Sequence, residues 1–173
     1  MHHDTLEVLT PEWADSPIDE AQVLGSAVWL WMHSTNHQDA PLHSLSTLLL
    51  PAIKKRQFIL ISEAGRPVFF LSWLNLSAEA EARYLREPAV CLPPADWDSG
   101  DRLWINDWVA PFGHTRCVSS LLRRRLWARR IGRSLYHRGE ERGMRVLNFQ
   151  GIAVPDLEAQ AWFATHPLPG HAF

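Results

Sequence analysis

Asp107 and His37 are the two residues of this 173-residue sequence whose side chains suit acid–base chemistry and whose neighbouring residues indicate how they are placed. Asp107 lies in an apolar segment whose alternating pattern puts Leu103, Ile105 and Asp107 on one face of a strand. A carboxylate on an apolar face is costly unless it is paired or accepts hydrogen bonds. Asp107 is therefore either one member of a functional pair or an acid that accepts backbone N–H bonds where the strand ends.

The second residue is His37, which lies in a polar loop beside Ser34, Thr35 and Asn36. An imidazole changes its charge near neutral pH, and small polar neighbours can fix its tautomer. The alternative is a histidine that is simply exposed to solvent. His33 has the i,i+4 spacing to His37, but no His-Glu-x-x-His pattern follows, so no metal site is predicted.

The remaining sequence contains none of the common catalytic signatures. A Gly-x-Ser-x-Gly elbow, a P-loop and a dinucleotide fingerprint are all absent. The two cysteines, Cys91 and Cys117, form neither a disulfide framework nor a zinc pattern, which favours a reduced, cytoplasmic setting. The amino-terminal residues lack the features of a signal peptide, and no apolar run reaches the roughly 20 residues that span a bilayer.

Apolar periodicity and capping residues predict the elements that must position these side chains. The predicted order is helices over 19–33 and 41–55, a hairpin of strands over 57–61 and 67–73, a helix from 75 to 84, a strand over 101–110, a basic helix over 118–138, a strand over 145–152 and a helix over 157–164. This order predicts an α/β (α+β) protein with a mixed, mostly antiparallel sheet flanked by helices. Residues 1–20 are expected to form a flexible extension, and residues 21–173 a single domain.

The net charge of −2 conceals a strong asymmetry. Residues 1–53 contain no Lys or Arg, whereas residues 116–145 contain ten arginines and two glutamates. Such a basic block indicates either an anionic partner or a solvated helix face.

Three segments, taken together, point to a family. The first comprises Val23-Leu24-Gly25, Trp29-Leu30-Trp31, Ser34, His37 and Leu50-Pro51-Ala52-Ile53. The second comprises Ser72-Trp73-Leu74-Asn75-Leu76-Ser77, Glu81 and Tyr84-Leu85. The third comprises Asp96-Trp97-Asp98-Ser99-Gly100-Asp101-Arg102, Trp104 and Asp107-Trp108-Val109-Ala110-Pro111-Phe112-Gly113. In this order and spacing the sequence resembles the RTX toxin-activating lysine acyltransferases over roughly residues 21–115.

The resemblance implies a GNAT-like fold and a homodimer. It also implies transfer of a fatty acyl group from acyl carrier protein to internal lysines of an RTX protoxin. The family's catalytic positions correspond to His37 and Asp107, and Ser34 lies at a position that supports activity. Gln150 stands where the family has a histidine in its Phe-His-Gly motif, so no role is assigned to it.

The implied chemistry suits these residues. A lysine amine has a pKa of about 10.4 and is protonated near pH 7, so it needs a base before it can attack a thioester. We expect His37 to be that base, Asp107 to orient it or to hold the ammonium, and Ser34 to steady the loop. A covalent acyl-His37 intermediate is the alternative route.

The expected co-substrate is acyl-ACP, with its phosphopantetheine thioester, and no cofactor is expected to be bound permanently. A basic surface is expected to bind the acidic carrier protein through Arg123, Arg124, Arg129 and Arg130. The turn containing Gly113 and Thr115 is expected to offer N–H groups to the phosphate. The tryptophan-rich motifs either line an acyl channel or belong to the core.

Two other functions remain open. One is a GNAT-like N-acyltransferase that uses acyl-CoA and a different amine. The other is a non-catalytic binding module that uses its arginines. Nucleic acid is not an expected partner, because the first half is acidic and no groove-entering motif is present.

Overall fold

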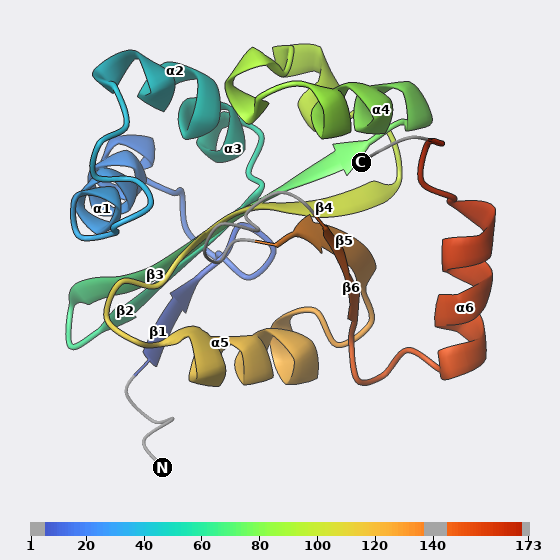
Figure 1. Ribbon diagram of the computed structural model, residues 1–173. Helices are drawn as coiled ribbons and strands as arrows, with labels where there is room; N and C mark the ends of the chain where they lie inside the picture. Colours follow the sequence, from blue (N-terminus) through green and yellow to red (C-terminus); the bar gives the residue numbers. More distant parts are fainter. Residues whose placement is uncertain (1–5, 137–144, 171–173) are drawn as a thin grey trace. The chain divides into compact units, whose positions relative to one another are not determined.

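The computed structural model describes residues 6–136 and 145–170, and it is a mixed α/β protein (Figure 1). Its six-stranded sheet has the order β1-β2-β3-β4-β5-β6. The β1–β2, β2–β3 and β5–β6 pairs are antiparallel, and β4–β5 is parallel. This arrangement confirms the predicted fold class, a mixed and mostly antiparallel sheet with helices.

The chain divides into two compact units. The first unit comprises Met1–Trp73 and Asp107–Thr115, and the second comprises Leu74–Asn106 and Arg116–Phe173. The expectation of a single domain over residues 21–173 stays a prediction.

In the first unit, helix α1 (Glu20–Met32) confirms the predicted helix and its cap. The Asp19 side chain accepts hydrogen bonds from the backbone N–H groups of Ala21 and Gln22, at 3.0 and 3.1 Å. The helix ends at His33, the residue that begins the loop carrying His37. The cap and the end of α1 therefore set where this loop starts.

The helix predicted over residues 41–55 forms three short pieces. They are η1 (Leu42–Ser44), α2 (Leu45–Leu48) and α3 (Leu50–Lys54). Pro51 lies in the first turn of α3, as expected for a residue that has no N–H to continue the preceding helix.

Strands β2 (Phe58–Glu63) and β3 (Arg66–Leu76) confirm the predicted hairpin. Ala64 and Gly65 at its turn have φ values of 50° and 73°, the positive φ pair of the tight turns that match strand twist. This turn places Arg66 opposite Glu63 in the strand register.

The amino-terminal region differs from the expected flexible extension. Leu6–Leu9 form β1, which pairs with β2 from Leu6 opposite Glu63 to Leu9 opposite Leu60. Backbone hydrogen bonds to a neighbouring strand order a segment that composition alone marks as polar and mobile. Residues 1–5 of the predicted extension lie outside the described residues.

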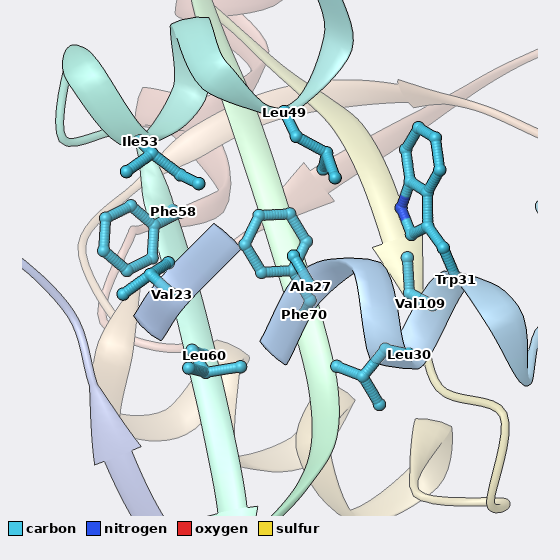
Figure 2. Packing of buried hydrophobic residues seen from close by; sticks show 10 residues of the cluster. All are labelled: Val23, Ala27, Leu30, Trp31, Leu49, Ile53, Phe58, Leu60, Phe70 and Val109. Atoms are coloured by element: carbon cyan, nitrogen blue, oxygen red, sulfur yellow. The ribbon is translucent and has the colours of Figure 1, made fainter. Parts of the chain in front are cut away.

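The core of the first unit lies between the helices and the hairpin (Figure 2). Its members are buried and apolar: Val23, Ala27, Leu30, Trp31, Leu49, Ile53, Phe58, Leu60, Phe70 and Val109. The rings of Phe58 and Phe70 stack with their centroids 6.3 Å apart. This packing holds α1 in place, and with it the loop that follows.

In the second unit, helix α4 (Ala78–Arg86) begins at the cap residue Ser77, whose hydroxyl accepts a hydrogen bond from the Ala80 N–H at 3.2 Å. Two short turns follow, η2 (Ala89–Cys91) and η3 (Pro94–Trp97). Strand β4 (Arg102–Val109) confirms the predicted strand, and its final residues belong to the first unit.

The long basic helix predicted over residues 118–138 is confirmed only as far as Leu126 and is wrong beyond it. Helix α5 (Thr115–Leu121) passes into a π turn, η4 (Leu122–Leu126), and the chain then enters strand β5 (Ile131–Leu135). Gly132 explains part of the difference, because a Cβ there would lie 2.8 Å from the Leu103 carbonyl oxygen on β4. Only glycine permits this close approach of parallel strands. Residues 137 and 138 of the prediction lie outside the described residues.

Strand β6 (Val146–Gln150) and helix α6 (Asp156–Thr165) confirm the last two predicted elements. β6 pairs with β5 from Ile131 opposite Gln150 to Leu135 opposite Val146.

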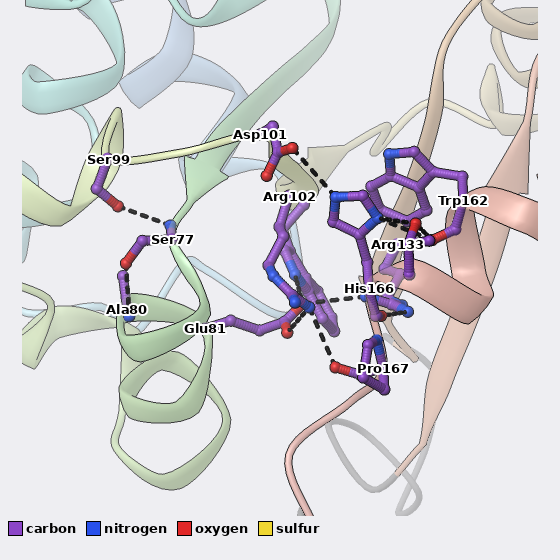
Figure 3. A network of polar contacts seen from close by, with 12 residues as sticks. Ser77, Ala80, Glu81, Ser99, Asp101, Arg102, Arg133, Trp162, His166 and Pro167 are labelled. Atoms are coloured by element: carbon purple, nitrogen blue, oxygen red, sulfur yellow. Dashed lines mark hydrogen bonds and ion pairs between the residues drawn. The ribbon is translucent and has the colours of Figure 1, made fainter.

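A buried ionic network joins several of these elements within the second unit (Figure 3). The Glu81 carboxylate accepts hydrogen bonds from Arg102 Nη1 at 2.7 Å, Trp104 Nε1 at 2.8 Å and Arg133 Nη1 at 3.1 Å. Arg102 Nη1 also donates to the Pro167 carbonyl at 3.1 Å. Burial lowers the pKa of Arg133, and the Glu81 carboxylate opposes that shift. Because Glu81 is almost wholly buried, its hydrogen bonds replace the water that it loses.

Candidate active site

His37 and Asp107 are in direct contact, although 70 residues separate them in the sequence. His37 Nε2 lies 2.9 Å from Asp107 Oδ1, and each side chain is 12% exposed. Both residues belong to the first unit. The structure thus brings together the two side chains that the sequence singled out, and their catalytic roles stay predictions.

The loop that carries His37 is fixed by its own backbone. The Ser34 N–H donates to the Trp31 carbonyl at 3.0 Å, and the N–H groups of His37 and Gln38 both donate to the Ser34 carbonyl, at 3.0 and 2.9 Å. The Ala40 N–H closes the turn on the His37 carbonyl at 2.9 Å. This compact turn fixes the backbone from which the His37 imidazole projects.

Ser34 contacts the other ring nitrogen, with 2.7 Å between its Oγ and His37 Nδ1. An ionised carboxylate only accepts hydrogen bonds, so the proton of a neutral ring lies on Nε2, facing Asp107. Nδ1 then has the lone pair and accepts a hydrogen bond from the Ser34 hydroxyl. The arrangement is a chain of three polar groups in which Asp107 fixes the tautomer and Nδ1 is the basic atom.

Asp107 is tolerated on a buried face because several N–H groups face it. Residues 103, 105, 107 and 109 of β4 are all buried, as the alternating pattern predicted. Asp107 Oδ2 accepts from Trp31 Nε1 at 3.0 Å, and Oδ1 accepts from the backbone N–H of Trp108 at 3.0 Å as well as facing His37. Asp107 thus pairs with a histidine and also accepts a backbone hydrogen bond, and its functional role stays a prediction.

Trp31 is the member of the site that sequence reasoning missed. Besides donating to Asp107, its ring lies 5.0 Å from the His37 ring, centroid to centroid, at an interplanar angle of 35°. A buried tryptophan usually needs a partner for its indole N–H, and that requirement was the available signal. Trp31 therefore holds both members of the pair from one side.

Trp31→Phe is expected to lower the free energy of unfolding by about 1.5–3 kcal/mol, because a hydrogen bond to a charged, buried carboxylate is lost while most of the ring packing remains. Urea unfolding followed by circular dichroism measures this loss. Trp29→Phe is the matched control: it lies in the same helix, and its N–H has no hydrogen-bond partner among the described residues. Equal losses in the two variants would show that Trp31 contributes packing alone.

The residues predicted to bind the donor lie in both units. Gly113 has a φ of 85°, and the Thr115 hydroxyl accepts a hydrogen bond from Trp108 Nε1 at 3.3 Å. Both belong to the first unit. Gly113 precedes, and Thr115 begins, an α-helix of only seven residues, so the helix dipole adds little there.

The predicted basic surface belongs to the second unit. Arg123, Arg124 and Arg129 are exposed, whereas Arg130 is half-buried. The Arg130 guanidinium lies 5.3 Å from the centroid of the Trp127 ring, and burial lowers the pKa of Arg130. Arg123 and Arg124 lie on the π-helical turn η4, and Arg129 and Arg130 lie on the loop after it. Their role in binding a carrier protein stays a prediction.

Two further findings concern residues 6–136 and 145–170 alone. Their helices are all too short or too polar to cross a bilayer. Nowhere in these ranges do three or more His, Cys, Asp or Glu side chains gather as metal ligands.

Comparison with known proteins adds the family. The family model described as the RTX toxin acyltransferase family matches residues 16–150, a range that includes Ser34, His37 and Asp107. Most of the chain is matched, and the chain therefore belongs to the RTX toxin acyltransferase family.

Individual relatives have related names. The chain is 38% identical over 149 residues to the protein-lysine palmitoyltransferase CyaC of Bordetella bronchiseptica, covering 84% of this chain and 79% of that protein. It is 39% identical over 107 residues to the protein-lysine myristoyltransferase RtxC of Kingella kingae, covering 62% of this chain and 64% of that protein. It is 42% identical over 106 residues to the RTX-I toxin-activating lysine-acyltransferase ApxIC of Actinobacillus pleuropneumoniae, covering 61% of each chain. These last two matches span less than two thirds of the relatives' own length.

Proposed function

We propose that this chain is a protein-lysine fatty acyltransferase that moves an acyl chain from acyl carrier protein to internal lysines of an RTX protoxin. His37 is the general base, Asp107 orients it, and Ser34 holds the loop. The observation that carries the proposal is the hydrogen-bonded chain Ser34–His37–Asp107 in a member of this family.

The hydrogen bonds of His37 support Nδ1 as the atom that takes the lysine proton. With the Nε2 proton directed at Asp107, Nδ1 is the ring atom left with a lone pair, and the lysine N–H replaces the Ser34 hydroxyl as its donor before the proton is transferred. The deprotonated amine attacks the thioester carbonyl carbon, so that a C–N bond forms and the C–S bond breaks. His37 gives this first proton to solvent before the attack, then takes the second proton, which the nitrogen loses as the C–N bond forms, and passes it to the leaving thiolate, so that an amide and a thiol result. Asp107 stabilises the imidazolium that forms between these two steps.

The relatives' names support the substrate class. The Bordetella and Kingella proteins are named protein-lysine palmitoyl- and myristoyltransferases, and the Actinobacillus protein is named toxin-activating. An acidic carrier protein as the donor is supported by the exposed arginines Arg123, Arg124 and Arg129. A docking surface of this kind predicts an association rate that falls with increasing salt. A homodimer belongs to the same proposal, and light scattering from the purified protein tests it.

The test is transfer of an acyl group to a purified RTX protoxin. The purified protein is mixed with that protoxin and either palmitoyl-ACP or palmitoyl-CoA, and acylated lysines are mapped by peptide mass spectrometry. We expect an added acyl mass on internal lysines with palmitoyl-ACP, none with His37→Ala, and full transfer with His43→Ala, an exposed histidine outside the site.

Other outcomes separate the alternatives. Efficient transfer from palmitoyl-CoA to a different amine would favour the alternative function, a GNAT-like N-acyltransferase. An acyl-enzyme trapped with the donor alone, and then chased to the toxin, would favour the acyl-His37 route. An unmodified toxin in the presence of folded enzyme would refute the proposal.

A further inference from the structure

Arg66 lies in an aromatic clamp within the first unit. Its guanidinium carbon is 5.0 Å from the centroid of the Trp29 ring and 4.8 Å from that of the Phe112 ring. The two rings are themselves 5.5 Å apart, centroid to centroid. The tight turn at Ala64 and Gly65 fixes the backbone from which Arg66 projects.

His33 stiffens the clamp. Its ring lies 4.1 Å from that of Trp29 and 5.5 Å from that of Phe112, measured between centroids. Its Nδ1–H donates to the Trp29 carbonyl at 2.7 Å, which anchors the ring to α1. Two rings from two separate segments thus contact one guanidinium, and the His33 ring packs against both of them.

Among residues 6–136 and 145–170, the N–H donors of Arg66 have no protein partner. Throughout the described ranges, no acceptor or carboxylate is found within hydrogen-bonding or ion-pair distance of its guanidinium. Stacking on aromatic faces leaves the edge of the planar guanidinium open, and that edge matches two oxygens of a phosphate or carboxylate. Aromatic contacts also reduce the entropy that a long side chain loses on binding. The clamp therefore has the form of a preorganised oxyanion site.

The clamp is tied to both segments that carry the catalytic pair. His33 precedes His37 by four residues, and Phe112 follows Asp107 by five, so Phe112 lies within about 18 Å of Asp107 even along a fully extended chain. Phe112 is 36% exposed, so an apolar ring faces solvent beside a cation. An extended ligand with an anion at one end and a less polar arm fits this pairing of surfaces.

We propose that Arg66, held against the adjoining rings of Trp29 and Phe112, binds the phosphate ester at the end of the pantetheine arm of the acyl donor. This inference rests on the proposed function, which places the thioester at His37. The same phosphate ester occurs in acyl carrier protein, as a phosphodiester, and in coenzyme A, as a diphosphate. Arg66 supplies two parallel N–H donors, while the rings cover the adjoining arm.

The test is a comparison of thioesters that differ in the phosphate alone. Calorimetric titration measures the affinity for S-octanoyl-4′-phosphopantetheine and for S-octanoylpantetheine, which lacks the phosphate. Arg66→Gln is expected to weaken binding of the first about 10- to 100-fold and to leave the second unchanged, as expected for loss of hydrogen bonds to a charged group. Arg66→Lys keeps the charge but loses the planar fork, so an intermediate loss is expected.

Controls separate the outcomes. Arg56→Gln removes an exposed cation from the same unit and is expected to leave both affinities unchanged. Repeating the titration with octanoyl-ACP and octanoyl-CoA identifies which source of phosphate Arg66 prefers. Equal losses for both small thioesters, or no loss for either, would overturn the proposal. A retained phosphate preference in a protein that acylates no toxin would instead refute the proposed function and leave this site standing.

Discussion

Asp107→Asn is expected to lower kcat for toxin acylation by about 10²–10⁴-fold, the range associated with a general base in the correct state. The carboxylate faces N–H groups of Trp31, His37 and Trp108, and it accepts from all three. An asparagine has one acceptor oxygen and one NH₂ group, so in either orientation its NH₂ meets an N–H. If the NH₂ faces His37, the ring proton moves to Nδ1, and the lone pair is lost from the side where Ser34 lies.

The measurement is the initial rate of acyl transfer at several donor concentrations. A fall in kcat with little change in KM for the donor is expected, because Asp107 acts on the base and not on the donor. Asp39→Asn, an exposed acid beyond the His37 turn, is the control and should retain the wild-type rate. A folded Asp107→Asn protein that works at a rate within threefold of wild type would contradict the assigned role.

The second large effect concerns stability. Glu81→Gln is expected to lower the free energy of unfolding by about 3–5 kcal/mol, because it leaves Arg102 and Arg133 buried without a counter-charge. The glutamine NH₂ group also faces N–H donors that the carboxylate had satisfied. Urea unfolding measures the loss. Glu158→Gln, an exposed acid in the same unit, should change the stability by less than about 0.5 kcal/mol.

A double variant tests whether Glu81→Gln destabilises the protein through the lost ion pairs or through unspecific disruption of the structure. Glu81→Gln combined with Arg102→Gln removes one of the stranded charges, so the double variant should lose less than the sum of the single losses. Strict additivity would mean that the two side chains stabilise the protein independently, contrary to their 2.7 Å contact.

Local patterns predicted the elements whose own residues determine them. Asp19 and Ser77 mark helix starts by their capping oxygens, and the turn at Gly65 marks the hairpin. The prediction for the basic segment failed because its leucines and arginines suit a helix, whereas the contacts that decide its structure come from residues distant in the sequence. Arg133 is needed by Glu81, and Gly132 allows β5 to approach β4. No local pattern records such partners, so tertiary contacts override propensity here.

In the candidate site, too, local patterns predict some of the residues but not how they contact one another. The alternation in β4 places Asp107 on a buried face, and family motifs select His37 and Ser34. Their distances and the direction of the ring proton come only from the fold. Trp31 and Arg66 were missed because their roles depend on partners in other segments, Asp107 in one case and Phe112 in the other.

The discontinuous course of the first unit has a consequence for protein synthesis. The chain leaves this unit at Trp73 and returns at Asp107, so His37 is translated 70 residues before its acid. At about 5–20 residues per second, the ribosome takes roughly 4–14 s to add them. A nascent or truncated chain that ends before residue 107 has the histidine but not the carboxylate that fixes its tautomer. The pair is therefore assembled only after the chain has returned to this unit.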